Sequence, residues 1–307
     1  MNRKVTVIGG AGFIGSHLVK SLVEQGFRVT VIDNLSTGKK SNIKNLAIDL
    51  RVYDITGDPK KIAAIIKGSE CVFHLAALTS VQESLESPTL YNLVNVIGTS
   101  NVLEACRIAG VSELVFSSTS AVYGNTELFP TNESVPLDPI STYALTKQIG
   151  ENYCKLYSSI YRIKTTCLRY FNVYGPNSNP DSSYRSVIPI FLEKAKAGKP
   201  LPITNDGEQR RDFIHVSDVV RANIAALHSP AYNALANASD KYHRIINIGS
   251  GENISVNQIA EMVGGKTVNV GFRLEPKISL ADVTAAKSYL DWNPLIKLED
   301  WLKGQTL

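Results

Sequence analysis

Short apolar runs alternate with longer stretches of helical periodicity in the amino-terminal part of the chain. Runs rich in β-branched residues and bounded by polar or glycine-containing turns predict strands. Between them, apolar residues recur at the spacing of amphipathic helices. The predicted strands are 5–8, 27–32, 46–53, 70–75, 113–117 and 165–173, and the long predicted helices are 88–109 and 142–160. This order predicts an α/β fold with a doubly wound parallel sheet, covered by helices on both faces.

The character of the sequence changes after residue 176. A loop rich in Asn, Pro, Asp and Ser leads into shorter elements. The predicted helices are 187–197, 218–227, 256–263 and 282–290, and the predicted strands are 245–248 and 268–270. We expect a larger domain over 1–176 and a smaller α/β lobe mainly over 177–307, with 212–248 packing back on the larger domain.

The first predicted strand ends in a glycine-rich turn that opens a helix. Gly9 lets the chain reverse, Gly12 has no side chain to block a pyrophosphate, and Gly15 lets the helix lie close to the strand. Free N–H groups at the start of such a helix face an anion. The turn is typical of a Rossmann dinucleotide site, although a purely structural glycine turn would share the pattern.

Asp33 stands at the tip of the second predicted strand, eighteen residues beyond Gly15. A carboxylate at this position is placed to bind both hydroxyls of an adenosine ribose, and it would repel a 2′-phosphate. NAD is therefore favoured over NADP. The alternative is a solvent-facing Asp in a turn. It is less favoured because the glycine turn lies upstream at the expected distance.

Composition and charge narrow the class of protein. The 307 residues, 44% of them hydrophobic, are enough for a full core, and the net charge of +4 is spread over short basic pairs separated by acidic residues. A nucleic-acid surface is therefore not expected. No apolar run approaches the roughly 20 residues that span a bilayer. Four cysteines without CxxC spacing suggest reduced thiols in a cytoplasmic protein, and five scattered histidines suggest no metal site.

A cluster of hydroxyl residues, 117–120, follows the strand predicted at 113–117. Further along, Tyr143 and Lys147 are four residues apart, so they project from one face of the predicted helix. Ligand sites of doubly wound sheets lie outside the carboxyl ends of the strands, where Thr119 stands. These three side chains are therefore able to converge on one site.

With these residues in view, the chain resembles the extended short-chain dehydrogenase/reductase family, and within it UDP-sugar 4-epimerases of the UDP-glucose and UDP-N-acetylglucosamine type. The resemblance covers almost the whole chain. The matching stretches are 9–15, 33–38, 74–77, 117–124, Tyr143 with Lys147, 169–176 and 211–216.

The resemblance implies an isomerase with NAD as a recycled cofactor. Tyr143 would be the acid/base, Thr119 would hydrogen-bond the sugar, and Lys147 would bind the nicotinamide ribose. C4 of the sugar would be oxidised to a 4-keto group and reduced again on its other face. NAD would bind to domain 1–176 and the UDP-sugar mainly to the lobe.

The family pattern also implies a larger set of contacts. The residues expected to bind NAD are Gly9, Gly12, Phe13, Ile14, Gly15, Asp33, Asn34, Ser36, Thr37, Gly38, Asp54, Ile55, Leu75, Ala76, Ala77, Thr79, Asn95, Ser117, Tyr143, Lys147, Tyr170 and Val173. The residues expected to bind the substrate are Ser80, Thr119, Tyr143, Asn172, Val187, Arg211, Arg273, Glu275 and Ser279. Arg273 and Glu275 stand one residue closer together than in the usual pattern.

Two positions bear on the reaction and the sugar. Related 4,6-dehydratases and decarboxylases carry an additional acid beside the hydroxyl residue, where this chain has Ser120 and Ala121, so simple epimerisation is favoured. A bulky aromatic narrows the sugar pocket in relatives at the position of Ser279. The small serine predicts that N-acetylhexosamines are accepted besides hexoses, unless this side chain faces elsewhere.

Other functions stay open at this point. One is an epimerase, reductase or dehydratase that acts on another nucleotide sugar. A second, from a different class, is a non-catalytic NAD-binding scaffold, although such relatives usually lose the Tyr or the Lys. The family also implies a homodimer, formed through the helices at 88–109 and 142–160.

Overall fold

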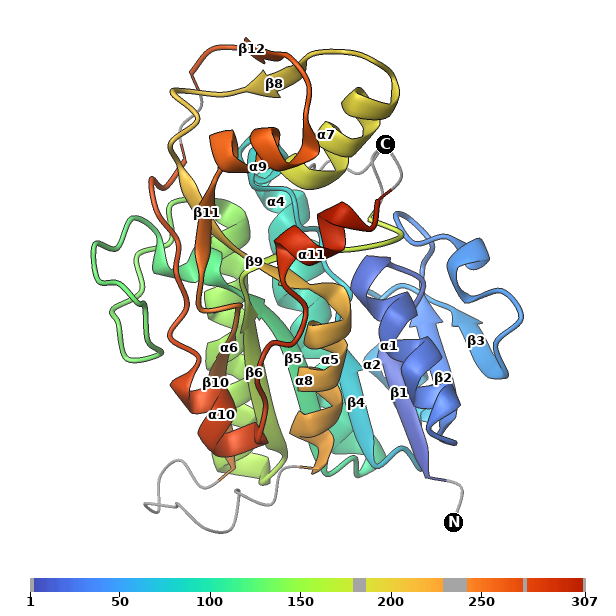
Figure 1. Ribbon diagram of the computed structural model, residues 1–307. Coiled ribbons are helices and arrows are strands. Elements are labelled where there is room, and N and C mark those ends of the chain that lie inside the picture. The colour runs from blue at the N-terminus through green and yellow to red at the C-terminus, as the bar shows by residue number, and fades with distance from the viewer. Residues whose placement is uncertain (1–2, 179–185, 229–241, 273–274, 306–307) are drawn as a thin grey trace.

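The computed structural model describes residues 3–178, 186–228, 242–272 and 275–305 (Figure 1). Its centre is a seven-stranded sheet in the order β10-β6-β5-β4-β1-β2-β3, in which every neighbouring pair is parallel. The strands are β1 (Lys4–Ile8), β2 (Arg28–Asp33), β3 (Ile48–Val52), β4 (Cys71–His74), β5 (Glu113–Thr119), β6 (Lys164–Tyr170) and β10 (His243–Ile248). The predicted doubly wound parallel sheet is confirmed.

Helices cover both faces of this sheet (Figure 1). One face packs against α1 (Phe13–Glu24), α8 (Val216–His228) and α10 (Thr284–Leu290). The other packs against α2 (Pro59–Ile66), α5 (Gly98–Ala109) and α6 (Thr142–Tyr161). Alternate residues of β1 serve the two cores, because successive side chains of a strand point to opposite faces.

The chain between the glycine turn and the lobe contributes several shorter helical elements. They are η1 (Lys40–Ile43), α3 (Val81–Glu86), α4 (Pro88–Tyr91), the π-helical η2 (Asn92–Ile97) and η3 (Ser120–Tyr123). The predicted helix 88–109 is therefore helical throughout but consists of α4, η2 and α5. Periodicity alone did not reveal the change of helix type at its centre.

The smaller lobe lies beyond the carboxyl ends of the main strands (Figure 1). It contains α7 (Val187–Lys196), β8 (Leu201–Ile203), α9 (Val256–Val263), β12 (Thr267–Asn269) and α11 (Leu298–Lys303). A separate apolar cluster holds α7, β8, α9 and α11 together, and β12 pairs with β8. A three-stranded sheet, formed by β7 (Asn172–Tyr174), β9 (Arg210–His215) and β11 (Asn253–Ser255), connects the lobe to the main sheet. Segment 212–248 includes α8, beside α1, and β10, beside β6.

The structure corrects the strand predicted at 165–173. β6 ends at Tyr170, and β7 begins at Asn172 and pairs with β9 in the other sheet. The backbone N–H of Phe171 still donates to Ile248 of the main sheet, at 3.0 Å. The chain changes sheets without a Gly, a Pro or a polar turn between the two strands, which is why the pattern did not show the break. The strand predicted at 268–270 lies one residue earlier, as β12.

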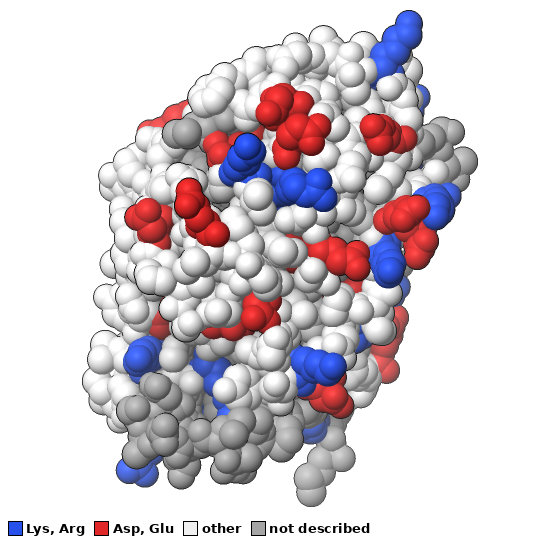
Figure 2. All heavy atoms as spheres, turned by 60° about the vertical axis from the view of Figure 1, so that its left-hand side comes forward, with Lys and Arg blue, Asp and Glu red and all other residues white. Residues whose placement is uncertain are grey.

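No helix in the described residues is long and apolar enough to cross a membrane. On the face seen in Figure 2, acidic and basic side chains are interspersed over a mostly uncharged surface.

Candidate active site

The glycine turn between β1 and α1 has two kinds of glycine. A Cβ on Gly9, whose φ is 84°, would lie 2.6 Å from the backbone nitrogen of Ala76. A Cβ on Gly15 would overlap the carbonyl oxygen of Gly9. Packing therefore requires both of these glycines. At Gly12, by contrast, the closest atom to a Cβ is the Gly9 oxygen at 3.3 Å, so packing explains this glycine less well than a bound group does.

The first turn of α1 is open to an anion. Gly12 is its N-cap and offers no side-chain hydrogen bond, and the turn holds no acidic residue. The N–H groups of Phe13 and Ile14 belong to the set that a helix leaves without intrahelical acceptors. Together with the small Gly12, this turn fits the pyrophosphate of a dinucleotide.

Asp33 connects this turn to the end of β2. Its Oδ2 accepts from the backbone N–H of Ala11 at 2.9 Å, and its Oδ1 accepts from that of Leu35 at 2.8 Å. A Cβ on Gly38 would lie 3.0 Å from the same Oδ2. The loop that contains Asn34, Ser36 and Thr37 therefore returns to the Asp33 carboxylate at Gly38. An ionised carboxylate offers about four acceptor positions, which leaves two for ribose hydroxyls.

The loop after β3 is held in the same manner. Asn34 donates to Asp54 Oδ2 at 2.7 Å, and Thr56 donates to Asp54 Oδ1 from both its backbone and its hydroxyl. Partial burial opposes ionisation, but these hydrogen bonds outweigh it and lower the pKa of Asp54. Asn101 of α5 donates to the carbonyls of Ile55 and Gly57, at 2.9 and 3.1 Å. Sequence reasoning did not single out Asn101.

Asn95, in η2, organises the loop after β4. Its amide accepts from the N–H of Leu78 and donates to the carbonyl of Leu78, both at 2.9 Å, and it donates to Thr146 at 3.0 Å. These bonds place Asn95 against the segment Leu75–Thr79, which was predicted to approach NAD. Ser80 is the N-cap of α3 and accepts from the N–H of Glu83 at 3.2 Å.

The structure brings the end of β5 to the first turns of α6. The Nζ of Lys147 donates to the carbonyl of Ser117 at 2.8 Å and lies 4.9 Å from the centroid of the Phe116 ring. Thr119 is the last residue of β5, and its hydroxyl oxygen accepts from the N–H of Ala121 at 3.2 Å. Tyr143, one turn before Lys147, is 8% exposed.

The charge of Lys147 is held in a buried setting. Burial lowers its pKa to about 8, and the nearby carboxylate of Glu151 opposes that shift. Burial, together with the Lys147 charge, lowers the pKa of His74 to about 3, so His74 is neutral. At neutral pH, Lys147 is therefore the cation of this site and is poised to lose its proton only a little above neutrality.

Ser117 and Tyr170 meet on the opposite side of the strand end. Their hydroxyls lie 3.0 Å apart, and Tyr170 donates to Asn223 of α8, also at 3.0 Å. Burial raises the pKa of Tyr170 to about 12, so it stays a phenol. Val173, in β7, is half-buried next to this region.

The predicted substrate residues form two groups. Asn172 donates to the Ser279 hydroxyl at 3.4 Å and to the Asp212 carbonyl at 2.9 Å. Arg211 and Glu275 form an ion pair of 2.7 Å. Val187 is the first residue of α7. Arg273 lies outside the described residues.

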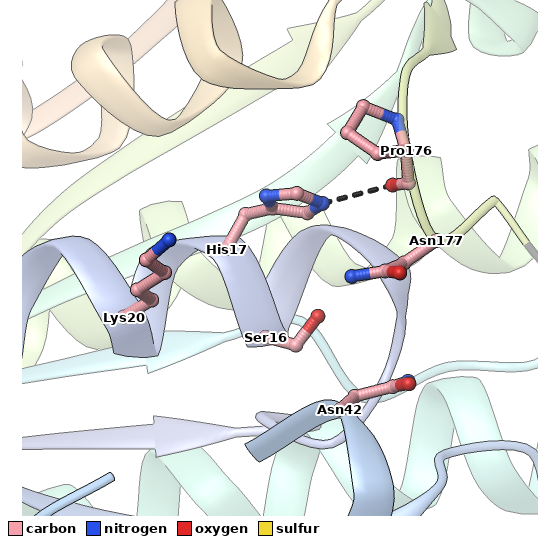
Figure 3. Close-up of a pocket in the computed structure, with 6 residues that line it drawn as sticks. All are labelled: Ser16, His17, Lys20, Asn42, Pro176 and Asn177. Atoms are coloured by element: carbon pink, nitrogen blue, oxygen red, sulfur yellow. Dashed lines mark hydrogen bonds between the residues drawn. The ribbon is translucent and has the colours of Figure 1, made fainter. Parts of the chain in front are cut away.

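A cavity of about 260 Å³ lies on the outer side of α1 (Figure 3). There the Nε2 of His17 lies 2.9 Å from the carbonyl oxygen of Pro176, and Lys20 stands on the other side of His17 (Figure 3). The lining residues are Ser16, His17, Lys20, Asn42, Pro176 and Asn177. None of the six is a predicted site residue, although Asn42 donates to the carbonyl of Ala11 and Ser16 to that of Phe13, so the cavity adjoins the glycine turn.

Comparison with known proteins supports one family. The profile of the NAD dependent epimerase/dehydratase family matches residues 5–249. A putative UDP-glucose 4-epimerase of Methanocaldococcus jannaschii is 38% identical, over 97% of this chain and 96% of the relative.

Solved structures agree with this match. A UDP-N-acetylglucosamine 4-epimerase of Methanobrevibacter ruminantium M1, in complex with UDP-N-acetylmuramic acid, is 35% identical with a TM-score of 0.90. A UDP-glucose 4-epimerase of Thermotoga maritima, with UDP-glucose, is 37% identical with a TM-score of 0.89. Both comparisons cover 98% of this chain and 96% of the other. The relatives also include a UDP-N-acetyl-α-D-glucosaminuronate decarboxylase of Bacillus cytotoxicus, 33% identical over 99% of this chain.

Proposed function

Since the chain belongs to the NAD dependent epimerase/dehydratase family, we propose that it inverts C4 of UDP-glucose and UDP-galactose, and of the corresponding N-acetylhexosamines. Membership confirms the predicted NAD-dependent enzyme of the UDP-sugar 4-epimerase type, an isomerase, and its cofactor. The site residues and the division into an NAD-binding domain, 1–176, and a nucleotide-sugar lobe, mainly 177–307, are part of this proposal.

Tyr143 is the proposed acid/base. It takes the proton of the sugar 4-hydroxyl while Thr119 hydrogen-bonds the same oxygen. After the 4-keto sugar has rotated to present its other face, Tyr143 returns the proton. Bound NAD supplies the acceptor, and then the donor, of the C4 hydride. Lys147 binds the nicotinamide ribose and stabilises the phenolate.

The charge of Lys147 accounts for part of the acidity that Tyr143 needs. A phenol has a pKa of about 10, and lowering this pKa to about 7 costs about 4 kcal/mol. A lysine cation about 6 Å away, at an effective dielectric near 20, supplies only about 2.8 kcal/mol. The positive nicotinamide ring of bound, oxidised NAD would supply much of the remaining free energy, so Tyr143 would be the strongest base in that state.

The observation that supports the proposal is the hydrogen bond of Lys147, one turn beyond Tyr143 on α6, to the carbonyl of Ser117, two residues before Thr119. Incubation with UDP-, GDP- and dTDP-sugars, followed by the anomeric NMR signals, tests the function. We expect conversion of UDP-sugars by the wild type and a loss of several orders of magnitude in Tyr143→Phe. Tyr153→Phe, which removes a phenol oxygen from the same helix, is the matched control. Near-normal turnover by Tyr143→Phe contradicts the assignment.

The turn after Thr119 supports epimerisation over decarboxylation. Ser120 and Ala121 begin η3 and place no carboxylate next to Thr119. Decarboxylation of a UDP-hexuronate would need a group that handles the substrate carboxylate. Release of CO₂ from a UDP-hexuronate in the same panel would favour that reaction instead.

The position of Ser279 supports a wide sugar pocket. Its hydroxyl lies within hydrogen-bonding distance of Asn172 and of the Asp212 N–H, at 3.4 and 3.3 Å, so this residue borders the predicted substrate site. We expect turnover of both UDP-glucose and UDP-N-acetylglucosamine, and a selective loss of the second in Ser279→Tyr. Complete inactivity of the wild type on the acetylated sugar refutes this specificity.

A homodimer is part of the proposal. Exposed apolar side chains lie along the helical segment from α4 to η2 and along α6, which are in contact with each other. They include Leu90, Leu93, Ile97, Leu145, Leu156 and Ile160, each more than 40% exposed. Exposed apolar side chains that gather on adjoining helices favour a protein–protein interface. Sedimentation should show a dimer for the wild type and a monomer for Leu93→Asp/Ile160→Asp.

A further inference from the structure

A buried ion pair lies directly behind the strand end that carries Ser117–Thr119. The guanidinium of Arg169, from β6, donates to both carboxylate oxygens of Glu151, from α6, at 2.7 and 2.9 Å. The two side chains are 2% and 3% exposed. Neither residue belongs to the predicted cofactor or substrate contacts.

Stability is a weak explanation for this pair. Two charges lose their hydration when they are buried, and apolar replacements of buried pairs are often neutral or stabilising. Arg169 and Glu151 are therefore better explained by what they hold in place.

The first group that the pair holds is Ser118. Its hydroxyl donates to Glu151 Oε1 at 2.5 Å, and the side chain is 3% exposed. Ser118 stands between Ser117, whose carbonyl accepts from Lys147, and Thr119. Because Glu151 also lies one turn beyond Lys147 on α6, the pair joins the strand end and the helix from behind.

The second group is Tyr123, at the end of η3. Its hydroxyl accepts from the Arg169 guanidinium at 2.9 Å and donates to Asn247 at 2.7 Å. The guanidinium also lies 4.8 Å from the centroid of the Tyr123 ring. Arg169 thereby fixes the turn after Thr119, while Glu151 fixes the residue before it.

We propose that Arg169 and Glu151 are positioning residues, which hold Ser117–Tyr123 against Tyr143 and Lys147 and so set the places of the Thr119 hydroxyl and of the Lys147 anchor. This inference rests on the proposed function for the substrate used in its test. The pair acts through Ser118 and Tyr123 and touches no substrate itself.

Ser118→Ala tests the proposal with the smallest change, because Glu151 keeps both of its bonds to Arg169. We expect kcat for UDP-glucose to fall roughly 10- to 100-fold, the effect of a small misplacement, with little change in KM. Ser69→Ala is the matched control. Ser69 precedes β4, at the other end of the sheet, and its buried hydroxyl lies 2.8 Å from that of Thr6. Loss of this hydroxyl should leave kcat unchanged. An unchanged kcat in folded Ser118→Ala overturns the proposal.

A second measurement needs no turnover. The absorbance of the Tyr143 phenolate in NAD-loaded protein, relative to the matching Tyr143→Phe variant, follows its titration. Ser118→Ala should move this titration to higher pH, because the neighbouring Ser117 carbonyl, which anchors Lys147, is then held less firmly. The titratable groups that face Lys147, namely Glu151, Cys154, Cys167 and His74, are the same in both proteins.

The two readouts separate the possible failures. If the wild type converts no UDP-sugar and Ser118→Ala still shifts the phenol titration, the proposed function is wrong and the positioning role stands. If the wild type is inactive and the titration is unchanged, the positioning role is wrong as well. If the wild type is active, the kcat of Ser118→Ala decides whether the positioning role is correct.

Discussion

The cofactor side and the sugar side of the active site are held by different kinds of contact. On the cofactor side, at the predicted pyrophosphate and adenosine-ribose end, backbone groups and glycines close in sequence meet the ends of β1 and β2, and Asp33 bonds the backbone of Ala11, 22 residues away. On the sugar side, side chains meet across long stretches of chain. Arg211 and Glu275 are 64 residues apart, and Asn172 and Ser279 are 107 apart.

This difference predicts how each side responds to change. The cofactor side is part of the fold, so most substitutions there affect the backbone and the free energy of unfolding. The sugar side is assembled from side chains on a lobe with its own apolar cluster, so substitutions there should change substrate binding and leave the fold intact.

Gly15→Ala should have the largest effect. The added Cβ meets the backbone oxygen of Gly9, which cannot move without shifting β1 or α1. We expect a loss of about 3 kcal/mol or more in the free energy of unfolding, measured with urea. Gly12→Ala is the matched control and should lose less than about 1 kcal/mol, because its Cβ meets only one atom at 3.3 Å. Equal losses in both variants contradict the packing role of Gly15.

The stability of the NAD-free protein should depend on Lys147. Burial lowers its pKa to about 8 from the ordinary 10.5, so between these values the unfolded chain binds more protons than the folded protein. Stability from this group therefore rises with pH across that window, by about 3 kcal/mol in total, and the full cost of burying the charge is present below pH 8. Unfolding of the wild type and of Lys147→Met, compared below pH 8 and near pH 10, measures the difference. An equal pH dependence in both proteins contradicts the buried cation.

Gly12→Ala should separate cofactor binding from folding. Its Cβ would enter the space assigned to the pyrophosphate, so we expect NAD affinity to fall roughly 10- to 100-fold while the fold persists. Calorimetric titration of NAD-free protein gives the affinity. Unchanged affinity would remove the argument for a phosphate next to Gly12.

Arg211→Lys should have the smallest effect and should spare the cofactor side. Lysine keeps the charge but loses the planar fork that suits phosphate oxygens, so KM for UDP-glucose should rise about fivefold with little change in kcat or NAD affinity. Arg210→Lys, whose neighbouring fork bonds Asn253 instead, is the control. A selective loss of NAD affinity in Arg211→Lys would show that the two sides are not independent.

The same difference explains what could be predicted from the sequence. The sheet, the glycine turn and Asp33 produce local signals, namely an apolar run, a turn and a carboxylate at fixed spacing. Tyr143 and Lys147 share a helix face, so their relation was also readable. These predictions needed only short-range geometry.

The remaining parts depend on contacts that no local pattern records. The change of sheet at Phe171 occurs where no Gly, Pro or polar turn marks it in the sequence. The role of Asn101 depends on two carbonyls more than 40 residues earlier. Arg169 and Glu151 lie in segments that read as an ordinary strand and helix, although a charged residue inside a buried strand was a signal that Arg169 has a partner. Ser279 and Asn172 could be assigned only by resemblance, and the structure adds that they are neighbours.

The central claim is that NAD is oxidant and reductant in one cycle at Tyr143, and the balance of cofactor tests it most directly. Purified wild-type protein is incubated with UDP-glucose and no added NAD, and both the sugar and the protein-bound nicotinamide are quantified over many turnovers. We predict that UDP-galactose accumulates to equilibrium while copurified NAD stays bound and its total is unchanged. Consumption of one NAD for each sugar converted would contradict the account.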